Sequence, residues 1–269
     1  MDNSFIPERD AAVRAARAVA LIIREHAGLV GRDDIREKGR HDLVTEIDEQ
    51  SQRLIMRELA DQFPDYGFLA EEDTEGARSV ASRRWIIDPI DGTTNFTHGV
   101  PPYAVSIALA EDDEVVVGVV LEVVSGETFT AVRGAGAFLD GRPMHVSTSP
   151  DLSGSLISTG FPYRAVDHLN PYLDVLGKFM YGCQGVRRHG SAAIDLAYLA
   201  AGRFDGFFET GLMPWDVAAG VLLIREAGGR VTQFSGKGDP VFSRQILGSN
   251  GRIHDQMIEV VKPLAAVVD

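Results

Sequence analysis

Residues 85–96 read Trp-Ile-Ile-Asp-Pro-Ile-Asp-Gly-Thr-Thr-Asn-Phe, an apolar run, then two carboxylates three positions apart and a glycine-threonine turn. The run at 85–87 is typical of a buried strand, so Asp88 is expected at its carboxyl end, where open α/β sheets bind their ligands. Because Pro89 has no amide hydrogen, we expect strand pairing to stop there. Asp91 would then turn back beside Asp88.

This stretch joins groups that attract a phosphate to groups that repel it. Gly92 lets the backbone approach a ligand closely, so its amide and those of Thr93 and Thr94 can face an anion. The carboxylates of Asp88 and Asp91 would repel the same anion, and a bridging Mg²⁺, which prefers oxygen ligands, resolves the conflict. Either acid alone could be part of an ordinary turn or cap. Their occurrence together behind a buried strand favours a metal-dependent phosphate site.

The composition is that of an ordinary globular protein, since 45% of the 269 residues are hydrophobic and 24% are charged. No apolar run reaches the roughly 18 residues of a membrane helix, and residues 1–10 lack the order of a signal peptide. We therefore expect a cytoplasmic location and no membrane partner. The single cysteine, Cys183, excludes a disulfide within the chain, which agrees with a reducing compartment.

The formal net charge of −13 argues against a nucleic acid as partner. It also means that an anionic substrate gains no attraction from the overall field of the protein. Cations bound at the site have to supply that attraction locally, so the acidic balance agrees with a metal site.

Periodicity and turn residues divide the chain into two halves. Residues 1–145 are expected to form an α+β half with a largely antiparallel sheet and the metal site, and residues 146–269 an α/β half that completes the active site. The helices expected in the first half span 7–26 and 45–63, the second opened by a capping box of Thr45 and Asp48, and further strands span 103–109, 115–124 and 127–132. The helices expected in the second half span 169–180, 191–201, 214–227 and a segment from 253, and the strands lie at 155–158, 207–208, 231–234 and 246.

Two further acidic sites lie elsewhere in the sequence. Glu71 and Glu72 follow the short apolar run 68–70, and Asp216 follows Pro214-Trp215 in the first turn of an expected helix. Adjacent glutamates are often solvated surface, and an acid in the first turn of a helix is favoured by the helix dipole alone. A capping acid held rigidly by its helix also makes a well-oriented metal ligand, so both interpretations of Asp216 can hold.

Together these stretches resemble the inositol monophosphatase family, within the lithium-sensitive, Mg²⁺-dependent phosphatase superfamily that includes fructose-1,6-bisphosphatase. They lie in family order, and the Asp-Pro-Ile-Asp-Gly-Thr-Thr core is highly specific. The matching stretches are Asp42-Leu43-Val44-Thr45-x-x-Asp48, Leu69-Ala70-Glu71-Glu72, residues 85–96, Gly190-Ser191-Ala192-Ala193, and Trp215-Asp216-Val217-Ala218-Ala219-Gly220 with Glu226-Ala227-Gly228-Gly229.

The resemblance implies an α/β (α+β) fold, the layered α-β-α-β-α sandwich that is fructose-1,6-bisphosphatase-like, and usually a homodimer. It also implies about two to three Mg²⁺ ions in each active site. Glu71, Asp88 and the Ile90 carbonyl would hold the first ion. Asp88, Asp91 and Asp216 would hold the second, and Glu71 with waters a weaker third.

The implied reaction is hydrolysis of inositol monophosphate to inositol and phosphate by direct attack of a metal-activated water. Thr93 would orient this water, Asp48 would hold the Thr93 hydroxyl, and Glu71 would accept the proton, although a purely capping role for Asp48 stays open. The carboxylate of Glu209 can accept hydrogen bonds from two hydroxyls of a polyol. Residues expected at the substrate are Asp91, Gly92, Thr93, Thr94, Gly190, Ser191, Ala192, Glu209 and Asp216.

Two other classes of protein compete with this interpretation. A haloacid-dehalogenase-type phosphatase also carries an apolar strand and an Asp-Gly-Thr segment, but it needs two Asp residues two positions apart, whereas Asp88 and Asp91 are three apart. A phosphate-binding protein without activity would be expected to lack a metal ligand or Thr93, and this chain has all of them. Within the enzyme class, fructose 1,6-bisphosphate, histidinol phosphate and a 3′-phosphonucleotide are the alternative substrates.

Overall fold

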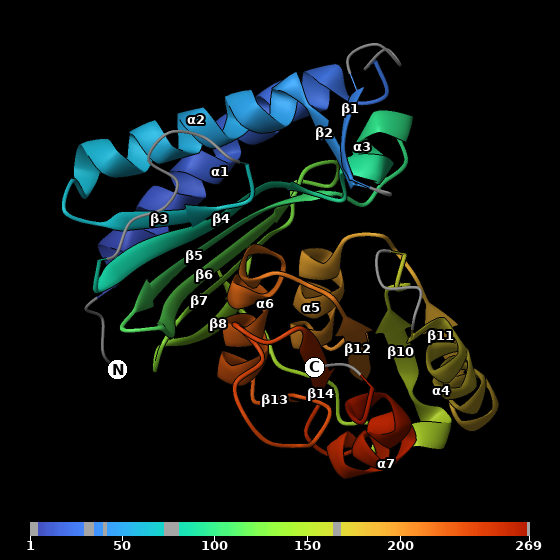
Figure 1. The fold of residues 1–269 in the computed structure, drawn as a ribbon. Coiled ribbons are helices and arrows are strands. Elements are labelled where there is room, and N and C mark those ends of the chain that lie inside the picture. Colours follow the sequence, from blue (N-terminus) through green and yellow to red (C-terminus); the bar gives the residue numbers. More distant parts are fainter. Residues whose placement is uncertain (1–4, 30–34, 40–41, 73–80, 164–167, 268–269) are drawn as a thin grey trace.

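The structure, a computed structural model, describes residues 5–29, 35–39, 42–72, 81–163 and 168–267, with the backbone alone at 35–39 and 42–44. These residues form five layers in the order α-β-α-β-α (Figure 1). Helices α1 and α2 cover one face of a seven-stranded sheet, α5 and α6 lie between it and a five-stranded sheet, and α4 and α7 cover the far side. The layered sandwich expected from the sequence is confirmed.

The helices and strands expected from the sequence are present with small differences at their ends, whereas α3, the β1-β2 hairpin, β8, β9 and β11 are not anticipated by the sequence patterns. The helices of the described residues are α1 (Ile6–His26), α2 (Glu46–Gln62), α3 (Thr93–His98), α4 (Leu169–Gly182), α5 (Ala192–Ala200), α6 (Pro214–Glu226) and α7 (His254–Ala265). The strands are β1 (Ile35–Gly39), β2 (Asp42–Thr45), β3 (Gly67–Ala70), β4 (Arg83–Asp91), β5 (Ala104–Glu111), β6 (Glu114–Glu122), β7 (Thr128–Val132), β8 (Gly136–Leu139), β9 (Arg142–Pro143), β10 (Leu156–Thr159), β11 (Gly185–Arg187), β12 (Gly206–Thr210), β13 (Arg230–Thr232) and β14 (Gln245–Ser249).

The larger sheet has the order β3-β4-β5-β6-β7-β8-β9, and every pair in it is antiparallel except β3 with β4. This confirms the largely antiparallel sheet predicted for the first half. The smaller sheet has the order β11-β10-β12-β14-β13, with β10 parallel to both of its neighbours and β14 antiparallel to both of its own. None of the described helices has the length and apolar character needed to cross a membrane.

Strand β4 does not end at Pro89, so the prediction that pairing stops there is wrong. Asp88 pairs with Ser106 of β5, the register then shifts, and pairing resumes with Asp91 opposite Ala104. Three steps along β4 thus match two steps along β5, which is the signature of a β-bulge. The bulge takes up the proline, whose missing amide hydrogen would otherwise interrupt the ladder.

The expected turn at Gly92 is the start of helix α3. Gly92 caps this helix with a φ of 97°, in the left-handed region that favours glycine, and the amide of Phe96 donates to the Gly92 carbonyl at 3.0 Å. A Cβ atom at Gly92 would lie 3.1 Å from the carbonyl oxygen of Gly190. The glycine therefore lets two segments about a hundred positions apart meet at the end of β4.

Helix α6 lies directly against the larger sheet at a glycine of β6. A Cβ atom at Gly118 would lie 2.8 Å from the carbonyl oxygen of Ala219, closer than side chains are found. One hydrophobic core therefore contains residues of the sheet and of the two central helices, for example Ile86, Val120, Leu196 and Val221. This packing carries the start of α6 to the carboxyl end of β4.

Replacing Gly118 with alanine should separate α6 from β6 and lower the free energy of unfolding by about 1–3 kcal/mol, the usual cost of overpacking a core. Gly182→Ala at the end of α4 is the control, because its Cβ would meet the Leu152 side chain at an ordinary 3.9 Å. The control should change stability by less than about 0.5 kcal/mol. Urea unfolding of both variants measures the difference, and equal stabilities would show that the close approach at Gly118 does not constrain the fold.

Candidate active site

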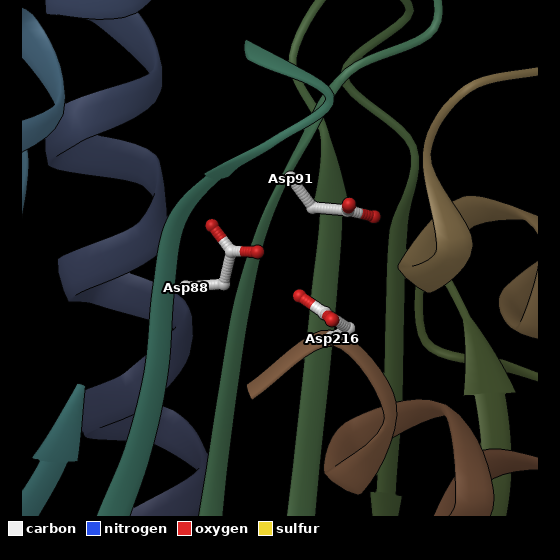
Figure 2. Close-up of side chains that lie close together, drawn as sticks. All are labelled: Asp88, Asp91 and Asp216. Carbon is white, nitrogen blue, oxygen red and sulfur yellow. The ribbon is translucent and has the colours of Figure 1, made fainter. Parts of the chain in front are cut away.

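Three carboxylates from two distant segments converge at the carboxyl end of β4. Asp88 and Asp91 come from that strand and Asp216 from the first turn of α6, with one oxygen of each lying within 4.8 Å of the others (Figure 2). Asp88 is only 2% exposed and Asp91 only 9%. In the sequence, Asp216 lies 125 positions after Asp91 and 128 positions after Asp88. The fold brings the three side chains together.

Hydrogen bonds fix each carboxylate through one named oxygen. The Ile90 amide donates to Asp88 Oδ1 at 2.9 Å, and the Met213 amide donates to Asp216 Oδ2 at 2.7 Å. Asp91 Oδ2 accepts from the Ser191 hydroxyl and from the amide of Ala193, each at 2.6 Å. Asp216 therefore caps its helix and also belongs to the acidic cluster, as the two compatible interpretations of the sequence allow.

Glu71 joins the cluster from the parallel strand β3. Its amide donates to the Ile87 carbonyl at 3.1 Å, which places Glu71 beside Asp88. Burial, followed by the charges of Glu71, Asp91 and Asp216 and a hydrogen bond with the Glu71 side chain, raises the pKa of Asp88 well above its usual range. Burial also raises the pKa of Asp91 to about 6, although its hydrogen bonds with Ser191 and the backbone act in the opposite direction.

This donor set fits a hard divalent cation. It consists of carboxylate oxygens, and the backbone carbonyl of Ile90 lies at the same turn. Acids crowded in this way keep their negative charges together only when a cation compensates the repulsion. The raised pKa values of Asp88 and Asp91 show how strongly the protein alone disfavours that charged state.

Thr93 and Asp48 form a second part of the site. Thr93 Oγ1 lies 3.3 Å from Asp48 Oδ1 and 3.1 Å from the Ile90 carbonyl oxygen, and it can donate its hydrogen to either. The other oxygen of Asp48 accepts from the Thr45 amide at 2.9 Å and closes the capping box of α2. Asp48 thus caps α2 through one oxygen, and its other oxygen lies within hydrogen-bond distance of Thr93, so the catalytic role expected for it stays a prediction.

The second half of the chain contributes further polar groups to the site. These groups, from Ser191, Ala192 and Glu209, are called the polar wall below. Ser191 caps α5 and donates to Asp91, and the Ala192 backbone also hydrogen-bonds to Asp91. Burial, followed by the charges of Asp195 and Asp216, raises the pKa of Glu209 at the end region of β12 well above its usual range. Thr94 lies in the first turn of α3 with an exposed side chain.

Several residues at this wall are not anticipated by the sequence reasoning. A Cβ atom at Gly160 would overlap the carboxylate of Glu209, so this carboxylate lies directly over the glycine. The Arg188 guanidinium lies over the rings of Phe161 and Tyr163, 5.6 and 5.5 Å from their centres. Gly160 directly follows strand β10, the same strand-end signal that identified Asp88, whereas nothing in the local sequence marks Arg188.

A family model confirms the resemblance drawn from the motifs, since the model of the inositol monophosphatase family matches residues 7–265. The chain belongs to the inositol monophosphatase family. An inositol-1-monophosphatase of Rhizobium meliloti is 45% identical over 84% of this chain and 85% of its own, and the Nus factor SuhB of Escherichia coli is 41% identical over 94% of both. The solved structure of the Thermotoga maritima IMPase has a TM-score of 0.87 at 39% identity and covers 96% of this chain and 97% of its own.

The protein is accordingly an enzyme, a phosphatase of a metal-dependent family. The acidic cluster of Asp88, Asp91 and Asp216 is the part of its described residues that could bind the metal.

Metal binding should release protons from these carboxyls. Because burial raises the pKa of Asp91 to about 6 and that of Asp88 well above its usual range, the metal-free protein holds protons there near that pH. A cation binds the deprotonated form, so Mg²⁺ added at the pKa of Asp91 should displace protons, and the release should decline as the pH rises above that pKa. Calorimetry of Mg²⁺ binding in buffers of different ionisation enthalpy measures the number of protons released per protein. A release that stays constant with pH would contradict the assigned shifts.

Proposed function

We propose that the protein hydrolyses inositol monophosphate to inositol and phosphate in an Mg²⁺-dependent reaction. The observation that carries this proposal is the convergence of Asp88, Asp91 and Asp216, with Glu71, beside the start of helix α3. The first-turn amides of a helix have no partner within it, so they can face a phosphate while the carboxylates hold the cations. Neither the carboxylates nor the amides alone would suffice to bind a phosphate ester.

The residues that would hold Mg²⁺ are Glu71, Asp88, Asp91, Asp216 and the carbonyl of Ile90. Bound Mg²⁺ supplies charge neutralisation and lowers the pKa of a bound water. Asp88 interacts with the Glu71 side chain and with both other aspartates, which makes it the central ligand of the proposed set.

The attacking water is oriented by Thr93 and Asp48. Asp48 Oδ1 takes the hydrogen of the Thr93 hydroxyl at 3.3 Å, which leaves the lone pairs of that hydroxyl to accept a hydrogen bond from water. Glu71 is the nearby carboxylate that accepts the proton of the water. The amides of Gly92 and Thr93 stabilise the charge that builds up on the phosphate oxygens.

The polar wall binds the alcohol part of the substrate. A polyol presents several hydroxyls that both donate and accept, and a carboxylate such as that of Glu209 can accept two of their hydrogens. The residues proposed to contact this part are Asp91, Gly190, Ser191, Ala192, Glu209 and Asp216, and Thr94 lies at the phosphate end.

Other small phosphate esters are the alternative substrates, because fructose 1,6-bisphosphate, histidinol phosphate or a 3′-phosphonucleotide could use the same metal centre. Relatives of the chain carry two kinds of name, inositol-1-monophosphatase and Nus factor SuhB. The acidic cluster of Asp88, Asp91 and Asp216 in this chain is the observation that favours hydrolysis as its function.

The proposal includes a homodimer and inhibition by lithium. Several apolar side chains of α4 are exposed, the largest fractions being 66% for Met180 and 96% for Tyr181, and exposed apolar side chains of this kind fit contact with a second copy of the chain. Sedimentation equilibrium of the purified protein tests whether it forms a dimer. A staphylococcal inositol monophosphatase-1, solved as a LiCl-soaked inhibitory complex, has a TM-score of 0.78 at 26% identity over 91% of this chain.

Assays of the purified protein against inositol 1-phosphate and the three alternative esters test the function directly. Activity should be highest on inositol 1-phosphate and should vanish on chelation. Asp88→Asn should lower kcat by about 10²–10³-fold, the loss typical of one preorganised group. Asp48→Asn keeps an acceptor oxygen for Thr93 and should lose less. Activity that survives exhaustive chelation would refute the metal mechanism, and equal losses in the two variants would refute the assigned hierarchy.

The route of attack determines the configuration at phosphorus. Pro89 and the bulge commit Asp88 and Asp91 to the metal cluster, so we expect water to attack directly in a single displacement. A phosphorothioate ester made chiral with oxygen isotopes, hydrolysed in labelled water, should give product with inverted configuration. Retention would require two displacements and hence a covalent phosphoenzyme, which would restore the aspartyl-phosphate alternative.

A further inference from the structure

A buried glutamine of α2 is bonded to the segment that carries Glu71. Gln52 is fully buried, and its amide nitrogen donates to the Glu72 carbonyl while its amide oxygen accepts from the Glu72 amide, both at 2.9 Å. The side chain thus pairs with the backbone of Glu72 much as a neighbouring strand would. Glu72 itself is only 2% exposed, so this pairing lies away from solvent.

The residue before Glu72 is held from the opposite side. The Glu71 amide donates to Ile87 of β4 at 3.1 Å. The backbone at 71–72 is therefore fixed on one side by the sheet and on the other by Gln52, at the point where strand β3 has ended. Both contacts are needed to define the direction in which the Glu71 side chain leaves the backbone toward Asp88.

Gln52 and Asp48 lie one turn apart on the same helix. Residues four positions apart share one face of a helix, and here Asp48 contacts Thr93 while Gln52 binds Glu72. Helix α2 therefore sets the positions of Thr93 and Glu71, the two groups proposed to orient the water and to take its proton.

We infer that Gln52 is a positioning residue that holds Glu71 in the geometry required for metal binding. The inference rests on the proposed metal role of Glu71. Only an amide side chain of this length can donate to the Glu72 carbonyl and accept from its amide at the same time, because a carboxylate only accepts and a thioether does neither effectively. Groups that orient metal ligands in this way typically alter metal affinity or activity by about 10–100-fold when they are removed.

The test is the binding of Mn²⁺ to the chelator-treated protein without substrate, measured from the EPR signal of free Mn²⁺. Gln52→Met removes both hydrogen bonds and keeps the length of the side chain, and it should raise the dissociation constant by about 10–100-fold. Ser51→Ala is the control, because Ser51 is a fully buried neighbour whose hydroxyl makes no hydrogen bond to the described residues. It should bind Mn²⁺ as the wild type does.

A second readout separates positioning from general stability. The Mg²⁺ concentration for half-maximal activity should rise in Gln52→Met, while KM for the ester at saturating Mg²⁺ should stay near that of the wild type. Gln52→Asn, which draws the same amide back by one methylene, replaces the methionine variant if that one does not fold and should also bind Mn²⁺ more weakly.

A folded variant of Gln52 that binds Mn²⁺ as tightly as the wild type overturns the inference and leaves the proposed function intact. A wild type that binds no Mn²⁺, with Asp88→Asn as the reference for a lost site, would instead remove the metal site and the inference with it.

Discussion

The bulge in β4 between Asp88 and Asp91 is the constraint on which the site depends. Side chains alternate between the faces of a strand, so two residues three positions apart in a regular strand point to opposite sides. The register shift adds one residue to β4 and brings Asp91 back to the side of Asp88. Asp216 reaches the same side because Gly118 lets α6 lie against the sheet. The cluster in Figure 2 therefore requires both a local irregularity and a close long-range contact.

Without a bound cation, burying the same cluster of carboxylates in its charged form is energetically unfavourable. Burial and mutual repulsion raise the pKa values of Asp88 and Asp91, so the protein without cations favours their protonated forms. The hydrogen bonds from Ser191 and the backbone hold the carboxylates in place despite that repulsion. Asp88 and Asp91 belong to β4 and Asp216 to α6, and Asp91 is also hydrogen-bonded to the start of α5. The described residues thus place one oxygen of each aspartate where a divalent cation could bind.

Local sequence patterns predict the helices, the strands and the acidic site residues well. They predict the contacts between segments distant in sequence poorly. Buried strands, helix stripes and acids at strand ends are local patterns, which is why Asp88, Asp91 and Asp216 could be found from spacing and family motifs. The bulge could not, because whether pairing stops at Pro89 depends on β5, the partner strand. Gln52 and Gly160 were missed for the same reason, since each acts through a residue distant in sequence. Periodicity also cannot show that α5 and α6 lie between two sheets.

The charges around Glu209 favour a neutral polyol over a second phosphate in the substrate. Among the described groups that affect its pKa most, Asp195, Asp216 and Asp91 are acids, and Arg188 is a cation that already lies over two aromatic rings. A second phosphate would have to approach Glu209 and Asp195, which are not among the proposed metal ligands, whereas hydroxyl groups can donate hydrogen bonds to Glu209. The metal centre can serve any small phosphate ester, so discrimination has to come from this wall. Its acidic character supports the proposal of inositol monophosphate, rather than fructose 1,6-bisphosphate, as the substrate.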